Sequence, residues 1–192
     1  MDISIGFKDS ERELIAQMYW QAFGPKLGPV LGPENKGIAF IRDVLDPTHA
    51  LCARTSTGTL LGVAGFKTYE SALVDGTLGD MARHFGWFGA AWRATVLSLL
   101  ERDIENERFL MDGIFVHAQA RGRGVGTLLL DAIAERAREK GYAEVRLDVI
   151  DSNVRARSLY ERRGFVAQPA DHIGLLRHVF GFKSATPMTL AI

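Results

Sequence analysis

The sequence predicts a mixed α/β fold, because short segments with the alternating pattern of strands lie between longer segments with the periodicity of helices. The clearest strand is at residues 143–150, where valine and leucine alternate with charged residues. The clearest helix is at residues 124–140, which are amphipathic and are followed by Gly141, a common residue type just beyond a helix end. The 192 residues fit a single domain over 1–192, with a variable helical insertion at about 70–108.

The first third of the chain predicts two helices and a hairpin. Gly and Pro residues between positions 24 and 33 are expected to end the first helix, and Asp46-Pro47 to close the second. A glycine-containing turn at residues 56–59 is expected to join two strands. In chain order the predicted elements are a strand at 3–7, a helix that Ser10 caps and whose apolar positions reach Phe23, a helix at 34–44, and strands at 50–54 and 60–67.

The segment at 70–108 carries a weaker pattern, a helical face whose apolar positions are Trp92, Val96, Leu99 and Leu100. A face of this kind is most often core, and a pocket wall or a dimer interface are the alternatives. Beyond this segment we expect a strand at 109–116, a short helix that starts at Ser152 or Asn153 and runs to about Arg163, and a last strand at 184–192.

Composition argues against several classes of protein. Lys plus Arg and Asp plus Glu number 23 each, so overall charge does not favour binding to nucleic acid or to an anionic membrane. The sequence has neither a bilayer-spanning apolar run nor a signal-peptide pattern, and we therefore expect a cytoplasmic location. Cys52 lies in an apolar run, which indicates a buried strand residue and not a nucleophile. The five histidines form no ligand motif, so no metal is expected.

A glycine-rich loop between the strand at 109–116 and the helix at 124–140 is the main chemical signal. Its three glycines at alternate positions let several backbone N–H groups point into one concavity, and the following helix adds its positive dipole end. Two arginines add positive charge. The loop therefore predicts a phosphate or diphosphate site, the alternative being a tight helix entry alone. A Walker A loop would need a lysine, and a dinucleotide fingerprint would need glycine where Thr127 stands, so both are excluded.

The spacing Arg121-x-x-Gly124-x-Gly126 resembles the pattern of the GNAT superfamily of acetyltransferases. The resemblance covers about residues 109–166, although Ala118 stands where many relatives have proline. It extends through Met111-Asp112-Gly113-Ile114-Phe115-Val116, Leu147-Asp148-Val149, Asn153, Ala156 and residues 159–165. It implies a central, mostly antiparallel mixed sheet of about seven strands with helices on both faces. The strands near Val116 and Val149 would splay apart to admit acetyl-CoA.

The resemblance also implies how the cofactor would be held. The backbone of Ile114, Phe115 and Val116 would pair with the pantetheine arm as an added strand does, and an N–H near Val116 would polarise the thioester carbonyl. Backbone N–H groups of the loop would hold the pyrophosphate, and two arginine side chains would help to neutralise it or the ribose phosphate. The loop residues so implied are Arg121, Gly122, Arg123, Gly124, Val125, Gly126 and Thr127.

The spacing of Asn153, Ala156 and Tyr160 independently places them on one helical face, with a small residue between two hydrogen-bonding ones. By resemblance, Asn153 would bond the pantetheine arm and Tyr160 would donate a proton to the departing thiolate. The alternative is that Tyr160 only packs. For the general base, Asp112 is the first candidate and a structural charge is its alternative. Glu70 is a weaker candidate, and a water chain is a third possibility.

These features predict an enzyme that transfers the acetyl group of acetyl-CoA to a primary amine by direct attack in a ternary complex, because no cysteine or serine is placed as a covalent relay. The acceptor would be a small-molecule amine or a peptide or protein N-terminus, and a homodimer is plausible. Two alternatives stay open: a non-catalytic CoA-binding or regulatory protein of the same fold, and an acyltransferase that uses another acyl-CoA.

Overall fold

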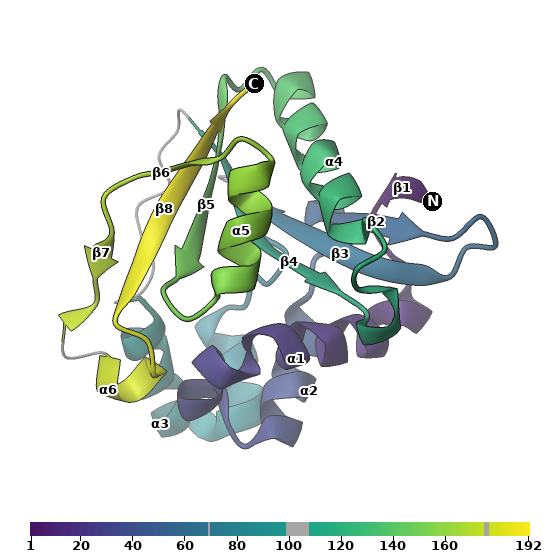
Figure 1. The fold of residues 1–192 in the computed structure, drawn as a ribbon. Coiled ribbons are helices and arrows are strands. Elements are labelled where there is room, and N and C mark those ends of the chain that lie inside the picture. The colour runs from purple at the N-terminus through teal and green to yellow at the C-terminus, as the bar shows by residue number, and fades with distance from the viewer. Residues whose placement is uncertain (69, 99–107, 175–176) are drawn as a thin grey trace.

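One mixed sheet with helices on both faces forms the centre of the protein (Figure 1). The computed structural model describes residues 1–68, 70–98, 108–174 and 177–192. Eight strands occur in these residues, in the order β1-β2-β3-β4-β5-β8-β6, with β7 also paired to β8. The strands are β1 Asp2–Ile5, β2 Ala50–Arg54, β3 Leu60–Lys67, β4 Phe109–Val116, β5 Glu144–Ile150, β6 Val166–Ala167, β7 Asp171–His172 and β8 Ser184–Ala191.

Alternation along the strands creates two cores, one on each face of the sheet. Leu51 and Ala53 of β2 pack in the cluster that includes α4, whereas Ala50 and Cys52 pack in the cluster that includes α1, α2 and α3. The α-helices are α1 Arg12–Leu31, α2 Glu34–Val44, α3 Leu78–Ser98, α4 Val125–Glu139, α5 Val154–Arg162 and α6 Arg177–Phe180.

The sheet opens between β4 and β5, the one neighbouring pair that runs parallel in the described sheet. The two strands pair at Phe109 with Val145 and at Leu110 with Arg146, and no further pairing between them is found in the described residues. Every other neighbouring pair is antiparallel. The predicted mostly antiparallel sheet, with a splay near Val116 and Val149, is confirmed.

The prediction that α1 ends near residue 24 is wrong, because the helix continues through Pro25 and Pro29 to Leu31. Proline costs a helix one backbone hydrogen bond but has a helical φ, and packing can outweigh the loss. Here the Trp20 ring packs where side chains are missing. A Cβ added at Gly24 would lie 3.0 Å from Nε1 of Trp20, and a Cβ added at Gly37 of α2 would collide with Cζ3 of the same ring.

Two further predictions need correction. Ser10 caps no helix: it lies within a 3-10 turn at Asp9–Glu11, and α1 begins at Arg12. In α3, Trp92 is 45% exposed and so is no core residue, whereas Val96 packs against a small cluster around Phe180. Leu99 and Leu100 lie outside the described residues.

Candidate functional site

A cavity of about 650 Å³ lies where β4 and β5 diverge. Its walls come from β4, the loop that follows it, β5, α5 and the middle of α1. Most of the predicted cofactor residues line it, namely Ile114, Phe115, Val116, Arg121, Gly122, Gly124, Val125, Gly126, Thr127, Asn153, Ala156 and Tyr160. The structure thus brings two sequence segments, 111–127 and 147–162, to one hollow.

The loop at the N-terminus of α4 has the geometry of an anion site. Gly122 and Gly124 have φ values of 75° and 82°, in the left-handed region that favours glycine. The N–H of Leu128 donates to the carbonyl of Gly124 at 3.0 Å. The N–H groups of the first turn come before this bond, and the helix itself offers them no acceptor. Free first-turn donors and the helix dipole together favour a phosphate group at this end of the cavity.

The positive charges at the cavity differ from the predicted ones. Arg121 lines the cavity, and its Nε atom donates to the carbonyl of Val116 at 3.1 Å. Arg123 is exposed and lies outside the described cavity wall, so its predicted role finds no geometric support. Arg155 and Arg162 of α5 line the cavity instead. Their separation of seven residues, two helical turns, is the sequence signal that would have placed them on one face.

The edge of β4 that faces the cavity is available to a ligand. From Met111 to Val116 this strand pairs with β3 on its other edge, and no pairing with β5 is found there in the described residues. An extended chain laid along such an edge forms the hydrogen bonds of an additional strand.

The helix α5 places Asn153 and Tyr160 across the cavity from β4. Asn153 is the N-cap: its side-chain oxygen accepts a hydrogen bond from the N–H of Ala156 at 3.2 Å, which leaves its amide NH₂ as a donor. Tyr160 is 6% exposed, and burial raises the pKa of its phenol to about 12. The phenol is therefore protonated at neutral pH. The pKa of a thiol is about 8.5, and the raised pKa of Tyr160 is further from this value than the pKa of an ordinary tyrosine is.

A β-bulge turns Asp112 toward α1. Gly113 pairs with Gly65 while Met111 pairs with Phe66, so Asp112 is an extra residue in β4. Met111 and Ile114, on either side of the bulge, both pack on the α4 face, which leaves Asp112 and Gly113 on the α1 face. There the pKa of Tyr19 is raised by burial and by the negative charge of Asp112. Glu70, the weaker candidate base, is exposed and lies outside the described wall.

Sequence reasoning did not identify the individual residues that α1 contributes to the cavity wall. Tyr19, Phe23 and Lys26 line the cavity at the spacing i, i+4 and i+7. The same spacing is typical of ordinary core packing, so no distinct signal marked them.

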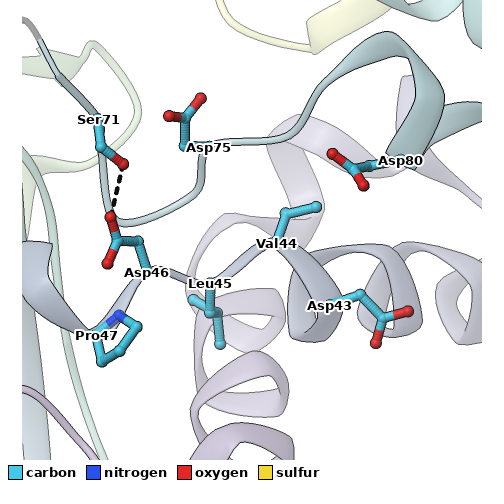
Figure 2. A pocket seen from close by; sticks show the side chains of 8 residues that line it. All are labelled: Asp43, Val44, Leu45, Asp46, Pro47, Ser71, Asp75 and Asp80. Carbon is cyan, nitrogen blue, oxygen red and sulfur yellow. Dashed lines mark hydrogen bonds between the residues drawn. The ribbon is translucent and has the colours of Figure 1, made fainter.

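A smaller hollow of about 280 Å³ lies beside α2 and is lined by Asp43, Asp46, Asp75 and Asp80 (Figure 2). Three of these carboxylates have structural partners. Asp46 accepts from the Ser71 hydroxyl at 2.7 Å, Asp43 pairs with Nε2 of His84 at 3.0 Å, and Asp80 accepts from the N–H of Thr77 at 2.8 Å. Among the described residues, no group of three or more His, Cys, Asp or Glu is arranged to hold a metal.

Two other observations bear on predictions from the sequence. Cys52 is buried in β2, and burial raises its pKa to about 11, which disfavours the reactive thiolate. The interpretation as a core residue is confirmed. Within the described part of the chain, no helix has the length and apolar character needed to cross a bilayer.

The sequence profile of the acetyltransferase (GNAT) family matches residues 13–165. Over 54 residues the chain is 39% identical to the thialysine N-epsilon-acetyltransferase of Bos taurus, an alignment that covers 28% of this chain and 32% of that protein. The corresponding Mus musculus protein is 41% identical over 54 residues, with the same coverage. The chain thus aligns with about a third of the length of these curated relatives.

The fold is also similar to that of a solved N-acetyltransferase from Staphylococcus aureus Mu50, with a TM-score of 0.69 and 14% identity over 99% of this chain and 100% of that one. At this identity the likeness establishes the shared fold and no more.

Proposed function

Because the chain belongs to the acetyltransferase (GNAT) family, we propose that it transfers the acetyl group of acetyl-CoA to a primary amine by direct attack in a ternary complex. One observation carries the proposal: a single cavity joins an anion-binding helix start to an open strand edge. The two features suit the two parts of a CoA ester, its phosphates and its extended arm. The named substrate of the curated relatives is an amine, and the short alignment makes its identity no guide to the acceptor here.

The residues at the cavity fit acetyl-CoA, which supplies the reactive thioester. The first-turn N–H groups of Val125, Gly126 and Thr127 hold the pyrophosphate, with positive charge from Arg121, Arg155 or Arg162 nearby. The open edge of β4 binds the pantetheine arm, and a backbone N–H of that edge stabilises the oxyanion that develops on the thioester oxygen. The amide NH₂ of Asn153 donates to the arm from α5.

Two side chains accept and donate the protons that the reaction transfers. The acceptor nitrogen forms a bond to the acyl carbon as the carbon–sulfur bond breaks. Asp112, placed on the α1 face by the bulge, accepts the proton that the acceptor ammonium loses. Tyr160 donates to the departing sulfur. Its raised pKa favours a hydrogen bond to the sulfur over complete proton transfer, because a phenol with a pKa of about 12 is a weaker acid than the thiol that would form.

Release of free thiol from acetyl-CoA tests the proposal. Wild-type protein is incubated with a panel of primary amines (amino acids, polyamines, aminoglycosides, peptides with free N-termini) and with matched alcohols. We expect amine-dependent thiol release together with an acetylated amine detected by mass spectrometry. Asp112→Asn should reduce the rate most at neutral pH, where the acceptor amine is protonated.

Protein that binds acetyl-CoA yet acetylates no amine in the panel would favour a non-catalytic CoA-binding protein. Equal rates with alcohols would contradict the choice of nitrogen as acceptor.

A further inference from the structure

The middle of α1 places an aromatic side chain against the backbone of β4. A Cβ added at Gly113 would lie 2.6 Å from Cζ of Phe23 and 3.2 Å from its Cε2, so the tip of the ring touches the strand where Gly113 lacks a side chain. Both residues line the cavity. The contact lies immediately after the bulge at Asp112, between the strand and the helix that covers it.

Two neighbouring rings fix the position of Phe23. Its ring centroid lies 4.6 Å from that of Tyr19 and 6.1 Å from that of Phe115, and Tyr19 and Phe115 are 5.6 Å apart. Phe115 is 4% exposed and belongs to the core shared with α1 and α2. We call Tyr19, Phe23 and Phe115 the aromatic cluster. Three rings in mutual contact, one of them anchored in the core, resist displacement by a ligand.

The aromatic cluster lies at one end of the path that a CoA ester would follow. The glycine loop follows Val116, the last residue of β4, and Gly113 lies three residues before Val116, which at about 3.3 Å per residue is roughly 10 Å along the strand. A donor whose phosphates lie at the loop and whose arm follows β4 therefore directs its acyl group toward the bulge. At the bulge lie the Phe23 ring, in contact with Gly113, and the carboxylate of Asp112, and neither of them accommodates a longer alkyl chain.

We propose that Phe23 closes the acyl end of the cavity and thereby restricts the donor to acetyl-CoA and acyl-CoAs of similar length. The inference rests on the proposed function and adds a specificity-determining residue to it. Removing part of the Phe23 ring opens an apolar space directly over Gly113. Such a space accommodates additional methylene groups of the acyl chain at little cost in free energy.

Calorimetric titration with CoA, acetyl-CoA, butyryl-CoA and hexanoyl-CoA tests the proposal without relying on turnover. We expect wild-type protein to bind hexanoyl-CoA at least about tenfold more weakly than acetyl-CoA. Phe23→Ala should reduce this ratio by about tenfold or more while changing the affinity for free CoA by less than about twofold. Phe23→Leu provides the same test with a smaller change in packing if the alanine variant does not fold.

Phe40→Leu is the matched control. Phe40 is 4% exposed and belongs to the same core as Phe23, but it lies outside the wall of the cavity. This variant should keep the wild-type ratio. Equal affinities of wild-type protein for acetyl-CoA and hexanoyl-CoA would overturn the inference, and so would an unchanged ratio in the Phe23 variants. Failure of wild-type protein to bind free CoA would instead overturn the proposed function.

A double-mutant cycle tests the contact itself. Gly113 has no positive φ, so alanine there is strained by the Phe23 ring and not by the backbone. Gly113→Ala should lower the melting temperature of the wild-type protein and have a much smaller effect in the Phe23→Ala background. The same decrease in both backgrounds would show that the ring does not rest on Gly113, and the inference would fall.

Discussion

Two of the walls of the cavity are built by different means. One wall comes from a single stretch of the chain, between Met111 on β4 and Thr127 at the start of α4, and its chemistry lies in backbone N–H groups and an open strand edge. The other wall is the middle of α1, which contributes the side chains of Tyr19, Phe23 and Lys26. We call them the backbone wall and the side-chain wall.

Because one wall presents backbone groups and the other presents side chains, we expect the two walls to have different roles. Under the proposed function, backbone groups would bind what every CoA ester shares, the phosphates and the arm, with few constraints on side-chain identity. Side chains determine shape and charge, and so they would select the acyl group and the acceptor. Substitutions in the backbone wall should therefore abolish cofactor binding, whereas substitutions in the side-chain wall should change selectivity.

The largest effect is expected at the backbone wall from Gly124→Asp. The substitution places a β-carbon in a left-handed conformation and a negative charge where the pyrophosphate would lie. Acetyl-CoA affinity should fall at least about 100-fold by calorimetry, because backbone strain and charge repulsion add.

Gly58→Asp is the matched control. Gly58 has a φ of 87° in the β2–β3 turn, and a Cβ there also meets no atom within 4 Å. The control should lose comparable stability and keep its acetyl-CoA affinity. Similar affinities for the two variants would mean that the loop is a structural turn.

A second test concerns Tyr160 and its protonation. Because burial raises the pKa of Tyr160 from about 10 to about 12, the folded state keeps a proton that the unfolded state releases above pH 10. The stabilisation is fully present below pH 10 and is lost as the pH rises to 12. It amounts to roughly 3 kcal/mol for a shift of this size. Wild-type protein should thus lose about that much more stability over this range than Tyr160→Phe, as measured by urea denaturation. Parallel stability curves would place the phenol in contact with solvent.

The same Tyr160→Phe variant should reduce turnover by about tenfold and leave acetyl-CoA affinity nearly unchanged. The expected loss is smaller than the roughly 100- to 10,000-fold typical of general acid catalysis, because the pKa of the phenol is poorly matched to that of a thiol. Tyr142→Phe serves as the control, since Tyr142 packs on Phe109 and lies outside the cavity wall. An unchanged rate in Tyr160→Phe, with chemistry shown to limit turnover, would remove Tyr160 from the mechanism.

The smallest effect is expected for the cations of α5. Arg155→Ala should weaken acetyl-CoA binding about fivefold at low ionic strength and less at high salt, because exposed charges are screened. Arg157→Ala, on the same helix, should change little, since Arg157 pairs with Glu161 at 2.9 Å and lies outside the wall. Equal losses in the two variants would point to the net charge of the helix and not to a contact.

The two walls also differ in how far the sequence predicted them. The strand at 109–116, the glycine loop and the helix after it are local patterns, in which neighbours in sequence are neighbours in space. Predictions for Gly124 as a bend and Asn153 as a helix start depend on short-range rules, and the structure agrees with both.

The side-chain wall depends on long-range packing, which such rules do not capture. The prolines of α1 predicted a break, yet Trp20 packs against glycines of α1 and α2 and the helix continues. This continuation adds Lys26 to the cavity wall, about one helical turn beyond Phe23. The contact between Phe23 and Gly113 joins residues 90 positions apart, and neither residue is unusual in its local sequence. For the same reason the sequence favoured Arg123, which is close to the loop in sequence, over Arg155 and Arg162.

The most direct test of the account is calorimetric titration of the wild-type protein with acetyl-CoA and with CoA, alongside ATP and NAD. The backbone wall predicts micromolar binding of both CoA species, because phosphates at the α4 start and an arm along β4 act together. It predicts no comparable binding of ATP or NAD, which have phosphates but no arm. Folded protein that binds neither CoA species, or that binds ATP equally well, would contradict the assignment of this cavity.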